Sequence, residues 1–256
     1  MRALVLSDVH GNLAALEAVL ANAPAHDALW CLGDLVDFGP EPDQCVARLL
    51  ELGARCVVGN HDQLAADGSA ADGWTDRRLG ASRRAALRSL PTELRIGGVT
   101  LRHGLADVLR PPDLSDFASF RDQLLLVGHT HLPLLYRPGG CGRSRWLEPP
   151  VGQPIALGRG RAIANPGSVG SSFVDPGLAS ALLYDTARRE LTWLAVPYPV
   201  DGVLARLRAA GAPAALLAGQ RQYIAGELEP MRRARAEHEA WSQLNLVCAA
   251  PPASGS

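Results

Sequence analysis

Short apolar runs alternate with amphipathic segments through the first sixty residues. The run at 3–7 is apolar and ends in polar residues, which is typical of a buried strand. Similar runs at 28–32 and 55–58 predict two more strands. Apolar residues at helical spacing predict helices at 12–22 and 41–52. This order predicts parallel strands with helices packed against the sheet.

Strand-like runs and turns dominate the second half of the chain, up to residue 196. The turn at 185–189 separates two apolar runs and predicts an antiparallel hairpin. Between the two halves, residues 74–90 predict one arginine-rich helix with a solvated charged face, and 112–123 predict a short helix. The remaining predicted strands are 99–102, 124–127, 134–136, 145–147, 154–157, 161–164, 180–184 and 191–196.

The last sixty residues predict a different organisation. Residues 200–210 and 214–240 have helical patterns, and the second carries many charges. We therefore expect one α/β domain at 1–199, a helical appendage at 200–250 and a disordered tail at 251–256. The two predicted helices are candidates for a lid or for a homo-oligomer contact.

Composition excludes several classes of partner. The net charge is -1, so the chain offers no bulk electrostatic attraction to nucleic acid or to an anionic membrane. No apolar run is long enough to cross a bilayer, and the N-terminus lacks an export signal. The five cysteines show no paired spacing, which favours reduced thiols. We expect a cytoplasmic protein.

Five short polar segments each follow a predicted strand. Such loops gather at the carboxyl edge of an α/β sheet, where ligands bind. Each segment alone is compatible with an ordinary turn or a core histidine, but their joint occurrence in this order favours a site. They are Asp8-Val9-His10-Gly11-Asn12, Gly33-Asp34-Leu35-Val36-Asp37, Gly59-Asn60-His61-Asp62, His103-Gly104 and Gly128-His129-Thr130-His131.

The donors in these segments are oxygen and nitrogen atoms. Carboxylate oxygens suit hard ions and imidazole suits Mn, Fe, Zn or Co, and no cysteine lies among them. Seven donors exceed the need of one ion. Two ions about 3.5–4 Å apart, sharing a carboxylate, form a known arrangement for displacement at phosphorus. We expect two divalent ions, with manganese first and Fe, Zn, Co, Ni or Mg as other candidates. The seven predicted ligands are Asp8, His10, Asp34, Asn60, His103, His129 and His131.

In this order the five segments resemble the calcineurin-like metallophosphoesterase superfamily, over residues 1 to about 196. Residues 33–42 and 165–170 are especially similar to its bacterial branch of small predicted phosphodiesterases. The resemblance implies an α/β (α+β) fold, a four-layer αββα sandwich of two mixed sheets flanked by helices. It also implies a division of the ligands. Asp8, His10 and His131 would hold one ion, Asn60, His103 and His129 would hold the other, and Asp34 would bridge them.

The implied activity is hydrolysis of a small phosphoester, preferably a diester, by attack of a metal-bridging hydroxide. By resemblance and position, His61 is the candidate general acid. An acidic partner would orient it, and we prefer Asp37, although Asp62 is nearer in sequence. Asp37 could instead cap backbone amides. The loop at 165–168 could offer amides to the substrate, or it could be a plain turn.

Two departures from the family pattern bear on the substrate. Protein phosphatases and diadenosine tetraphosphatases of this superfamily place arginine where this chain has Phe38. The protein phosphatases also place arginine where this chain has Val58. Arginine grips phosphate with two hydrogen bonds, so its absence favours a less charged ester. The alternatives are a phosphoprotein or dinucleoside tetraphosphate phosphatase, and a catalytically silent metal-bound scaffold for a partner protein.

Overall fold

A computed structural model describes residues 1–70, 73–105, 114–138, 144–172, 177–224 and 236. Its strands form two mixed six-stranded sheets. The first sheet has the order β3 (Arg55–Cys56), β2 (Ala28–Cys31), β1 (Arg2–Leu6), β11 (Leu178–Asp185), β12 (Glu190–Pro197) and β9 (Ile155–Ala156). The second has the order β4 (Glu93–Ile96), β5 (Val99–Arg102), β6 (Leu124–Leu126), β10 (Ala162–Pro166), β7 (Pro133–Pro138) and β8 (Ser144–Leu147).

The two sheets pack face to face, with helices outside. Strand β1 shows why, because alternate side chains leave opposite faces of a strand. Its Ala3 and Val5 join a core that includes Leu101 and Leu126 of the second sheet. Its Leu4 and Leu6 join a second core beneath the helices α1 (Leu13–Asn22), α2 (Pro42–Glu51), α3 (Asn60–Asp67) and α5 (Ala81–Arg88).

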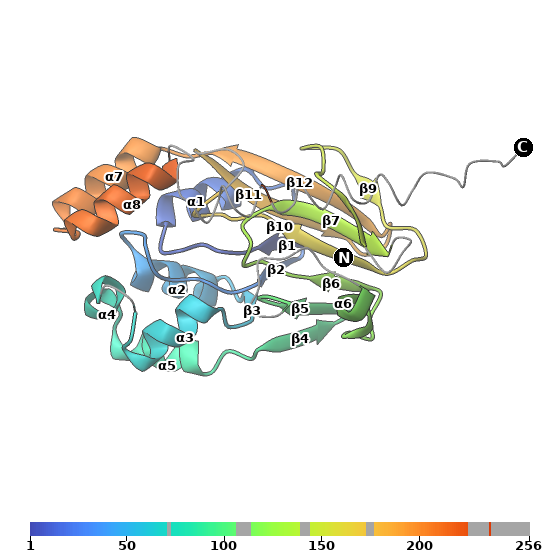
Figure 1. Cartoon of the computed structure of the whole chain (residues 1–256), viewed down its shortest axis with the longest axis horizontal. Coiled ribbons are helices and arrows are strands. Elements are labelled where there is room, and N and C mark those ends of the chain that lie inside the picture. The colour runs from blue at the N-terminus through green and yellow to red at the C-terminus, as the bar shows by residue number, and fades with distance from the viewer. Residues whose placement is uncertain (71–72, 106–113, 139–143, 173–176, 225–235, 237–256) are drawn as a thin grey trace, which may run out of the picture.

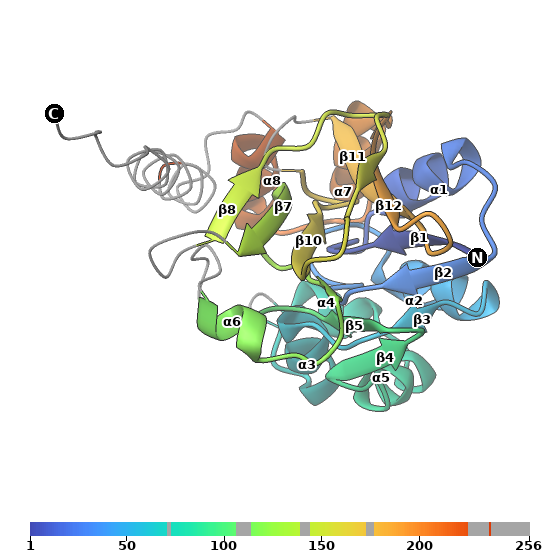
Figure 2. The ribbon, with the colours of Figure 1, turned by 90° about the vertical axis from the view of Figure 1, so that its right-hand side faces the viewer.

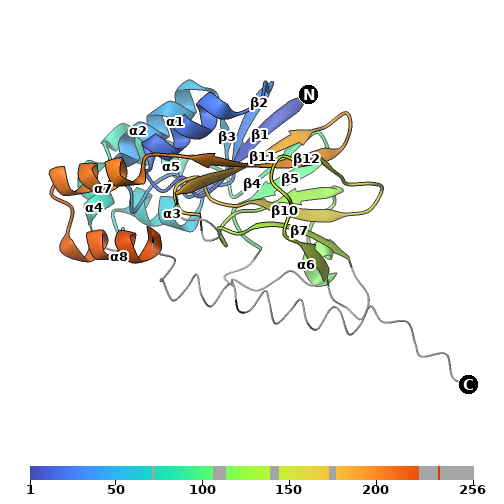
Figure 3. The ribbon, with the colours of Figure 1, turned by 90° about the horizontal axis from the view of Figure 1, so that it is seen from above.

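A single short helix covers the far face of the second sheet within the described residues. This helix, α6 (Leu114–Ala118), contributes Phe117 to a third apolar cluster with Leu125 and Ile163. Figures 2 and 3 show α1 and α2 on one side of the strands and α6 on the other. The arrangement is the predicted αββα sandwich, and among the described residues fewer helices cover this side than cover the first sheet.

The predicted pairing of the strands is confirmed. Strand β1 runs parallel to β2, which runs parallel to β3, as the βαβαβ pattern requires. Strands β11 and β12 form the predicted antiparallel hairpin. Two elements were missed because both are short. Helix α3 begins within the third polar segment, and β4 follows the arginine-rich region.

The prediction of one helix at 74–90 is wrong. The region forms α4 (Trp74–Arg78) and α5, because Leu79 is extended and Gly80 caps the second helix. The solvated arginine face is also partly wrong. Arg84 Nη1 donates to the carbonyl of Ala65 at 2.6 Å, and Arg88 donates to that of Ala66. These guanidiniums donate to carbonyls at the C-terminal end of α3. No further helical turn follows there to supply amide donors for those carbonyls.

Two further helices, α7 (Val200–Ala209) and α8 (Ala214–Ile224), lie at the left-hand end of the molecule in Figure 1. Val203 and Leu207 of α7 and Leu216 of α8 form an apolar cluster with Trp74, and Phe38 packs against it. The structure therefore contains the first part of the helix predicted at 214–240. Positions 225–235 and 237–240 of that pattern, and the tail at 251–256, lie outside the described residues.

Candidate metal centre

All five polar segments meet at one edge of the sandwich. The first sheet supplies Asp8, His10, Asp34 and Asn60, which follow β1, β2 and β3. The second sheet supplies His103, His129 and His131, which follow β5 and β6. Parallel strands bring their carboxyl ends to the same side, so loops far apart in the chain converge there.

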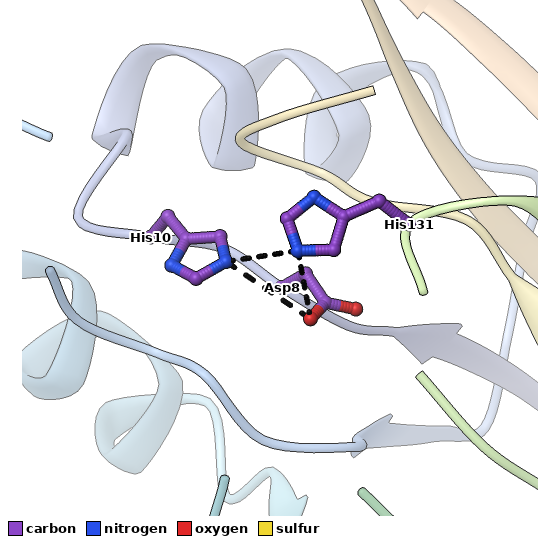
Figure 4. A group of neighbouring side chains, drawn as sticks. All are labelled: Asp8, His10 and His131. Atoms are coloured by element: carbon purple, nitrogen blue, oxygen red, sulfur yellow. Dashed lines mark hydrogen bonds and ion pairs between the residues drawn. The ribbon is translucent and has the colours of Figure 1, made fainter. Parts of the chain in front are cut away.

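Asp8, His10 and His131 form the first group of candidate ligands. Figure 4 shows the two imidazole rings and the carboxylate pointing toward one another. His10 Nε2 lies 3.1 Å from His131 Nε2, and His131 Nε2 lies 3.3 Å from Asp8 Oδ1. All three residues are buried.

Asp34, His103 and His129 form the second group. His103 Nε2 lies 3.1 Å from Asp34 Oδ2 and 3.2 Å from His129 Nδ1. Asn60 Oδ1 lies 2.9 Å from the same His103 nitrogen. Asp34 Oδ2 is also 3.9 Å from His10 Nε2 of the first group. Asp34 is therefore the carboxylate that stands between the two groups.

Backbone carbonyls fix which ring nitrogen faces inward. In the first group, His10 Nδ1 lies 3.2 Å from Val36 O, and His131 Nδ1 lies 2.8 Å from Ser171 O. In the second, His103 Nδ1 lies 2.8 Å from Leu32 O. A carbonyl only accepts, so each Nδ1 carries a proton and each Nε2 is the nitrogen that faces the centre.

This arrangement brings several acceptor atoms together at the centre of each group. Two Nε2 lone pairs oppose each other across 3.1 Å in the first group. In the second, His103 Nε2 faces three acceptors on Asn60, Asp34 and His129. A single N–H cannot serve three acceptors, whereas a cation can. The residues present therefore fit two cations, with the outer nitrogens held as metal-binding histidines require.

Charge and burial act against each other in these residues. Burial opposes ionisation of Asp34, but the charges of His103 and His10 hold its pKa well below the usual range. Burial opposes the charged form of His103, yet Asp34 raises its pKa to about 10. Burial lowers the pKa of His10 to about 3. Negative charge is thus concentrated where cations would bind.

Backbone strain is concentrated at the same edge. A positive φ is uncommon in residues other than glycine and marks positions where structure is held for function. Five of the candidate ligands adopt it, and Asp37 and Phe38 do so as well. The only other non-glycine residue with positive φ among those described is Arg189, in the β11–β12 turn. The five ligands with positive φ are Asp8, His10, Asp34, His129 and His131.

Two glycines permit the close approach of neighbouring loops. A Cβ on Gly59 would lie 2.1 Å from Asp34 Oδ1, and one on Gly128 would lie 2.8 Å from Asp8 Oδ2. Both distances are shorter than any contact a carbon atom tolerates. The glycine that precedes Asn60 and the one that precedes His129 are therefore required by packing against the two ligand carboxylates.

His61 lies beside the two groups, with its ring centroid 5.0 Å from that of His10. Its Nδ1 donates to Asp37 Oδ2 at 2.7 Å. Asp62 does not contact the ring. Its carboxylate accepts the amides of Leu35 at 2.8 Å and Gly59 at 2.9 Å and so ties two ligand loops together. Asp37, rather than Asp62, is the carboxylate that contacts the imidazole of His61, whose backbone amide donates to Asp34 Oδ1 at 2.9 Å.

The contact changes the charge state that His61 favours. Burial lowers the pKa of the imidazole, but the hydrogen bond to Asp37 and the charge of Asp34 outweigh it, so the pKa of His61 is raised. Burial opposes ionisation of Asp37 as well, yet His61 and Thr75 hold its pKa below the usual value. An ionised Asp37 beside a protonated His61 is therefore the favoured state.

A groove of about 340 Å³ opens beside the second group. His129, His103 and Asn60 are among the residues that line it. Arg102, the one cation in its described lining, donates to Glu93 Oε2 at 2.7 Å and to Ser119 Oγ at 3.1 Å. The groove thus presents a neutralised guanidinium rather than a free positive charge.

Sequence reasoning missed Thr75 and did not foresee the side-chain contacts of the loop at 165–168. Thr75 donates to Asp37 Oδ1 at 2.9 Å, although its region was interpreted as a solvated helix. Asn165, whose loop was expected to offer amides to the substrate or to be a plain turn, donates to Gly128 O at 2.8 Å and to Thr130 Oγ1 at 2.9 Å. Ser168 Oγ donates to Asp8 O at 2.8 Å. These contacts join residues far apart in the chain, so the spacing of the sequence does not reveal them.

Comparison with known proteins agrees with this geometry. The family model of calcineurin-like phosphoesterases matches residues 1–150, and the chain belongs to that family. The crystal structure of a metallophosphoesterase from Sphaerobacter thermophilus superposes with a TM-score of 0.79 at 32% identity, covering 89% of this chain and 99% of that one. The resemblance seen in the five segments is thereby confirmed.

Two curated relatives extend the comparison. The uncharacterized protein MJ0912 of Methanocaldococcus jannaschii is 30% identical over 217 residues, which cover 77% of this chain and 87% of that protein. A symmetrical bis(5'-nucleosyl)-tetraphosphatase of Pectobacterium carotovorum is 43% identical over 67 residues, which are 24% of each chain. Within the described residues, no helix has the length and apolar character needed to cross a membrane.

Proposed function

We propose that this protein is a metal-dependent phosphoesterase that hydrolyses a small phosphodiester. The proposal depends on one observation above all. Two groups of largely buried donors converge at one sheet edge, with Asp34 between them and the His61–Asp37 pair beside them. Asp8, His10 and His131 would hold one divalent ion. Asn60, His103 and His129 would hold the other, with Asp34 shared.

The chemistry that two divalent ions supply at such a site is Lewis-acid stabilisation of phosphate oxygens and generation of a nucleophile from water. Manganese is our first candidate, since a mixed set of carboxylate, amide and imidazole donors suits Mn, Fe, Zn or Co. The strained ligand loops would keep the donors in place before the substrate arrives.

The protein's own contribution to bond cleavage is a proton. The alkoxide or phenoxide that leaves phosphorus needs protonation, and His61 is the candidate donor. Asp37 holds Nδ1 of that ring at 2.7 Å, so the second nitrogen, Nε2, is free to give its proton to the leaving oxygen. Asp37 would stabilise the charged ring before transfer and fix its orientation.

Charge around the site supports a diester of low total charge. The guanidinium of Arg102 is already paired with Glu93 in the groove. Beside the first group, Phe38 places an apolar ring with its centroid 4.8 Å from that of His61 and 4.9 Å from that of His10. A substrate with several phosphates would meet no unpaired cation in either place, whereas a diester carries one negative charge and two organic groups.

A dinucleoside tetraphosphatase is the second candidate. The local identity of 43% to the Pectobacterium tetraphosphatase favours it, but that match spans only 67 residues. Phe38 stands against it, because an arginine at that position would bind additional phosphate. A silent scaffold is the third candidate, and retention of His61 with all seven donors stands against it.

The test is turnover by the purified protein loaded with Mn²⁺. We expect bis-p-nitrophenyl phosphate to be hydrolysed faster than p-nitrophenyl phosphate. Faster hydrolysis of the monoester would overturn the diester assignment, and release of phosphate from diadenosine tetraphosphate alone would favour the second candidate. No turnover on a broad panel of phosphoesters, with two metal ions bound, would support the scaffold.

A further inference from the structure

The two carboxylate oxygens of Asp37 have separate partners. Oδ2 accepts from His61 Nδ1 at 2.7 Å. Oδ1 accepts from Thr75 Oγ1 at 2.9 Å and from the amide of Phe38 at 3.1 Å. Asp37 and Thr75 are both buried, so water does not substitute for these contacts. Since the amide follows directly in the chain, Thr75 is the only distant side chain that fixes the carboxylate besides His61 in the described structure.

Thr75 reaches Asp37 from a different part of the fold. It lies in the first turn of α4, next to Trp74. The indole Nε1 of Trp74 donates to Gly39 O at 3.1 Å, which ties α4 to the same loop that carries Asp37. The indole ring packs with Leu207 and Leu216 of the C-terminal helices, and the Arg78 guanidinium lies 3.9 Å from the ring centroid. The position of Thr75 therefore depends on α7 and α8.

We propose that Thr75 is a positioning residue that holds Asp37 in the orientation needed to align His61, and that the C-terminal helices support it through Trp74. This inference rests on the proposed phosphoesterase function. Thr75 touches neither substrate nor metal ligands in this assignment. It acts through Asp37, and its loss should weaken proton transfer to the leaving group rather than substrate binding.

The physical reason is the loss of one of the two hydrogen bonds that Asp37 Oδ1 accepts. Replacing Thr75 by valine keeps the shape of the side chain but leaves Oδ1 with only the amide of Phe38 at a buried position. A buried carboxylate oxygen that loses a donor is less well stabilised, so the carboxylate would rotate toward other donors. Rotation would lengthen the contact of Oδ2 with His61. Serine at the same position keeps the hydroxyl and should keep the alignment.

The experiment compares two diesters that differ in how much they need an acid. Bis-p-nitrophenyl phosphate releases a stable phenoxide, whereas diphenyl phosphate releases a basic one that requires protonation. With Thr75→Val we expect kcat on diphenyl phosphate to fall roughly tenfold and kcat on bis-p-nitrophenyl phosphate to fall about twofold, with KM unchanged. Thr75→Ser should restore most of the loss.

Thr100 provides a matched control. It is also buried, and its Oγ1 also donates to an aspartate, Asp122, at 2.7 Å. Asp122 precedes β6, whereas the candidate ligands follow that strand. Thr100→Val removes the same kind of hydrogen bond, so it should leave the ratio of the two rates unchanged. A ratio that changes equally in both variants would overturn the positioning role.

A second readout does not need turnover. Nitrogen NMR of the imidazoles in the metal-free protein reports the hydrogen bond made at each ring nitrogen. We expect the His61 Nδ1 signal to show the hydrogen bond to Asp37 in the wild type and to lose it in Thr75→Val. If the wild type hydrolyses neither diester, the proposed function fails. If it hydrolyses both, and Thr75→Val lowers both rates equally with an unchanged His61 spectrum, only the positioning role fails.

Trp74→Phe tests the support from the C-terminal helices and replaces Thr75→Val should that variant not fold. It keeps the aromatic packing and removes the bond to Gly39 O. We expect the same dependence on the leaving group, reduced to about threefold on diphenyl phosphate. If the ratio of variant to wild-type kcat is the same for both diesters, the link from α4 to Asp37 is overturned.

Discussion

The two groups of candidate ligands are built from the same residue types but differ in exposure. Asp8, His10 and His131 are all buried, and carbonyls hold both of their imidazoles. In the second group, His129 is only half-buried and forms part of a groove wall with His103. The first group is therefore enclosed by protein, whereas the second borders a groove that a substrate can enter.

The two groups share one structural property. Each draws ligands from both sheets, because Asp8 and His10 follow β1 while His131 follows β6, and Asp34 follows β2 while His129 follows β6. Ions bound there would link the two sheets as well as bind substrate. We therefore expect the buried group chiefly to determine metal retention and the open group also to influence substrate binding.

Asp34→Asn should have the largest effect, because this carboxylate stands between the two groups. The amide removes the negative charge that two cations would share, so we expect turnover of bis-p-nitrophenyl phosphate to fall by roughly 10³-fold or more. Elemental analysis should show fewer than two metal ions per chain. Full activity with two bound ions would contradict the shared role.

His61→Ala should lower kcat by about 10²-fold or more, since a positioned acid typically contributes that much. Metal content should not change, because His61 is a ligand of neither group in our assignment. His26→Ala is a suitable control. This histidine lies in the loop before β2, with its ring nitrogen Nδ1 2.9 Å from Pro24 O. Its replacement should leave kcat and metal content unchanged. Loss of metal from His61→Ala would instead make His61 a ligand.

His131→Ala and His129→Ala should separate the two groups. Removing the buried ligand should weaken metal affinity by roughly tenfold to a hundredfold with little change in KM. Removing the ligand in the groove wall should weaken metal affinity less and raise KM. Titration with Mn²⁺, followed by calorimetry and by KM at saturating metal, measures both. If His129→Ala weakened metal affinity more than His131→Ala did, the proposed division between a metal-retaining group and a substrate-binding group would be refuted.

Arg102→Ala should have the smallest effect. Its guanidinium is paired with Glu93, so we expect KM to rise about threefold with kcat unchanged. A loss of a hundredfold or more would show that Arg102 grips the substrate phosphate directly. That outcome would weaken the argument for a substrate of low charge.

The sequence predicted the part of the fold that depends on local pattern. Short apolar runs identified the parallel strands β1, β2 and β3, and the polar segments directly after predicted strands identified the candidate ligand loops. The interruption at Leu79 and Gly80 was missed because the flanking residues are good helix formers and the break depends on neighbouring packing. Helix α3 was missed because it is short and starts inside a segment recognised for its chemistry.

The sequence by itself determined which donors this protein offers, since the residue types and their places after strands are visible in the chain. Only the tertiary structure decided how they are paired. It placed Asp37 rather than Asp62 against His61, aligned Thr75 behind it, and set His10 against His131. Such contacts join residues 24 to 121 positions apart, and spacing along the chain carries no record of them. They arise when two sheets pack and bring their strand ends to one edge.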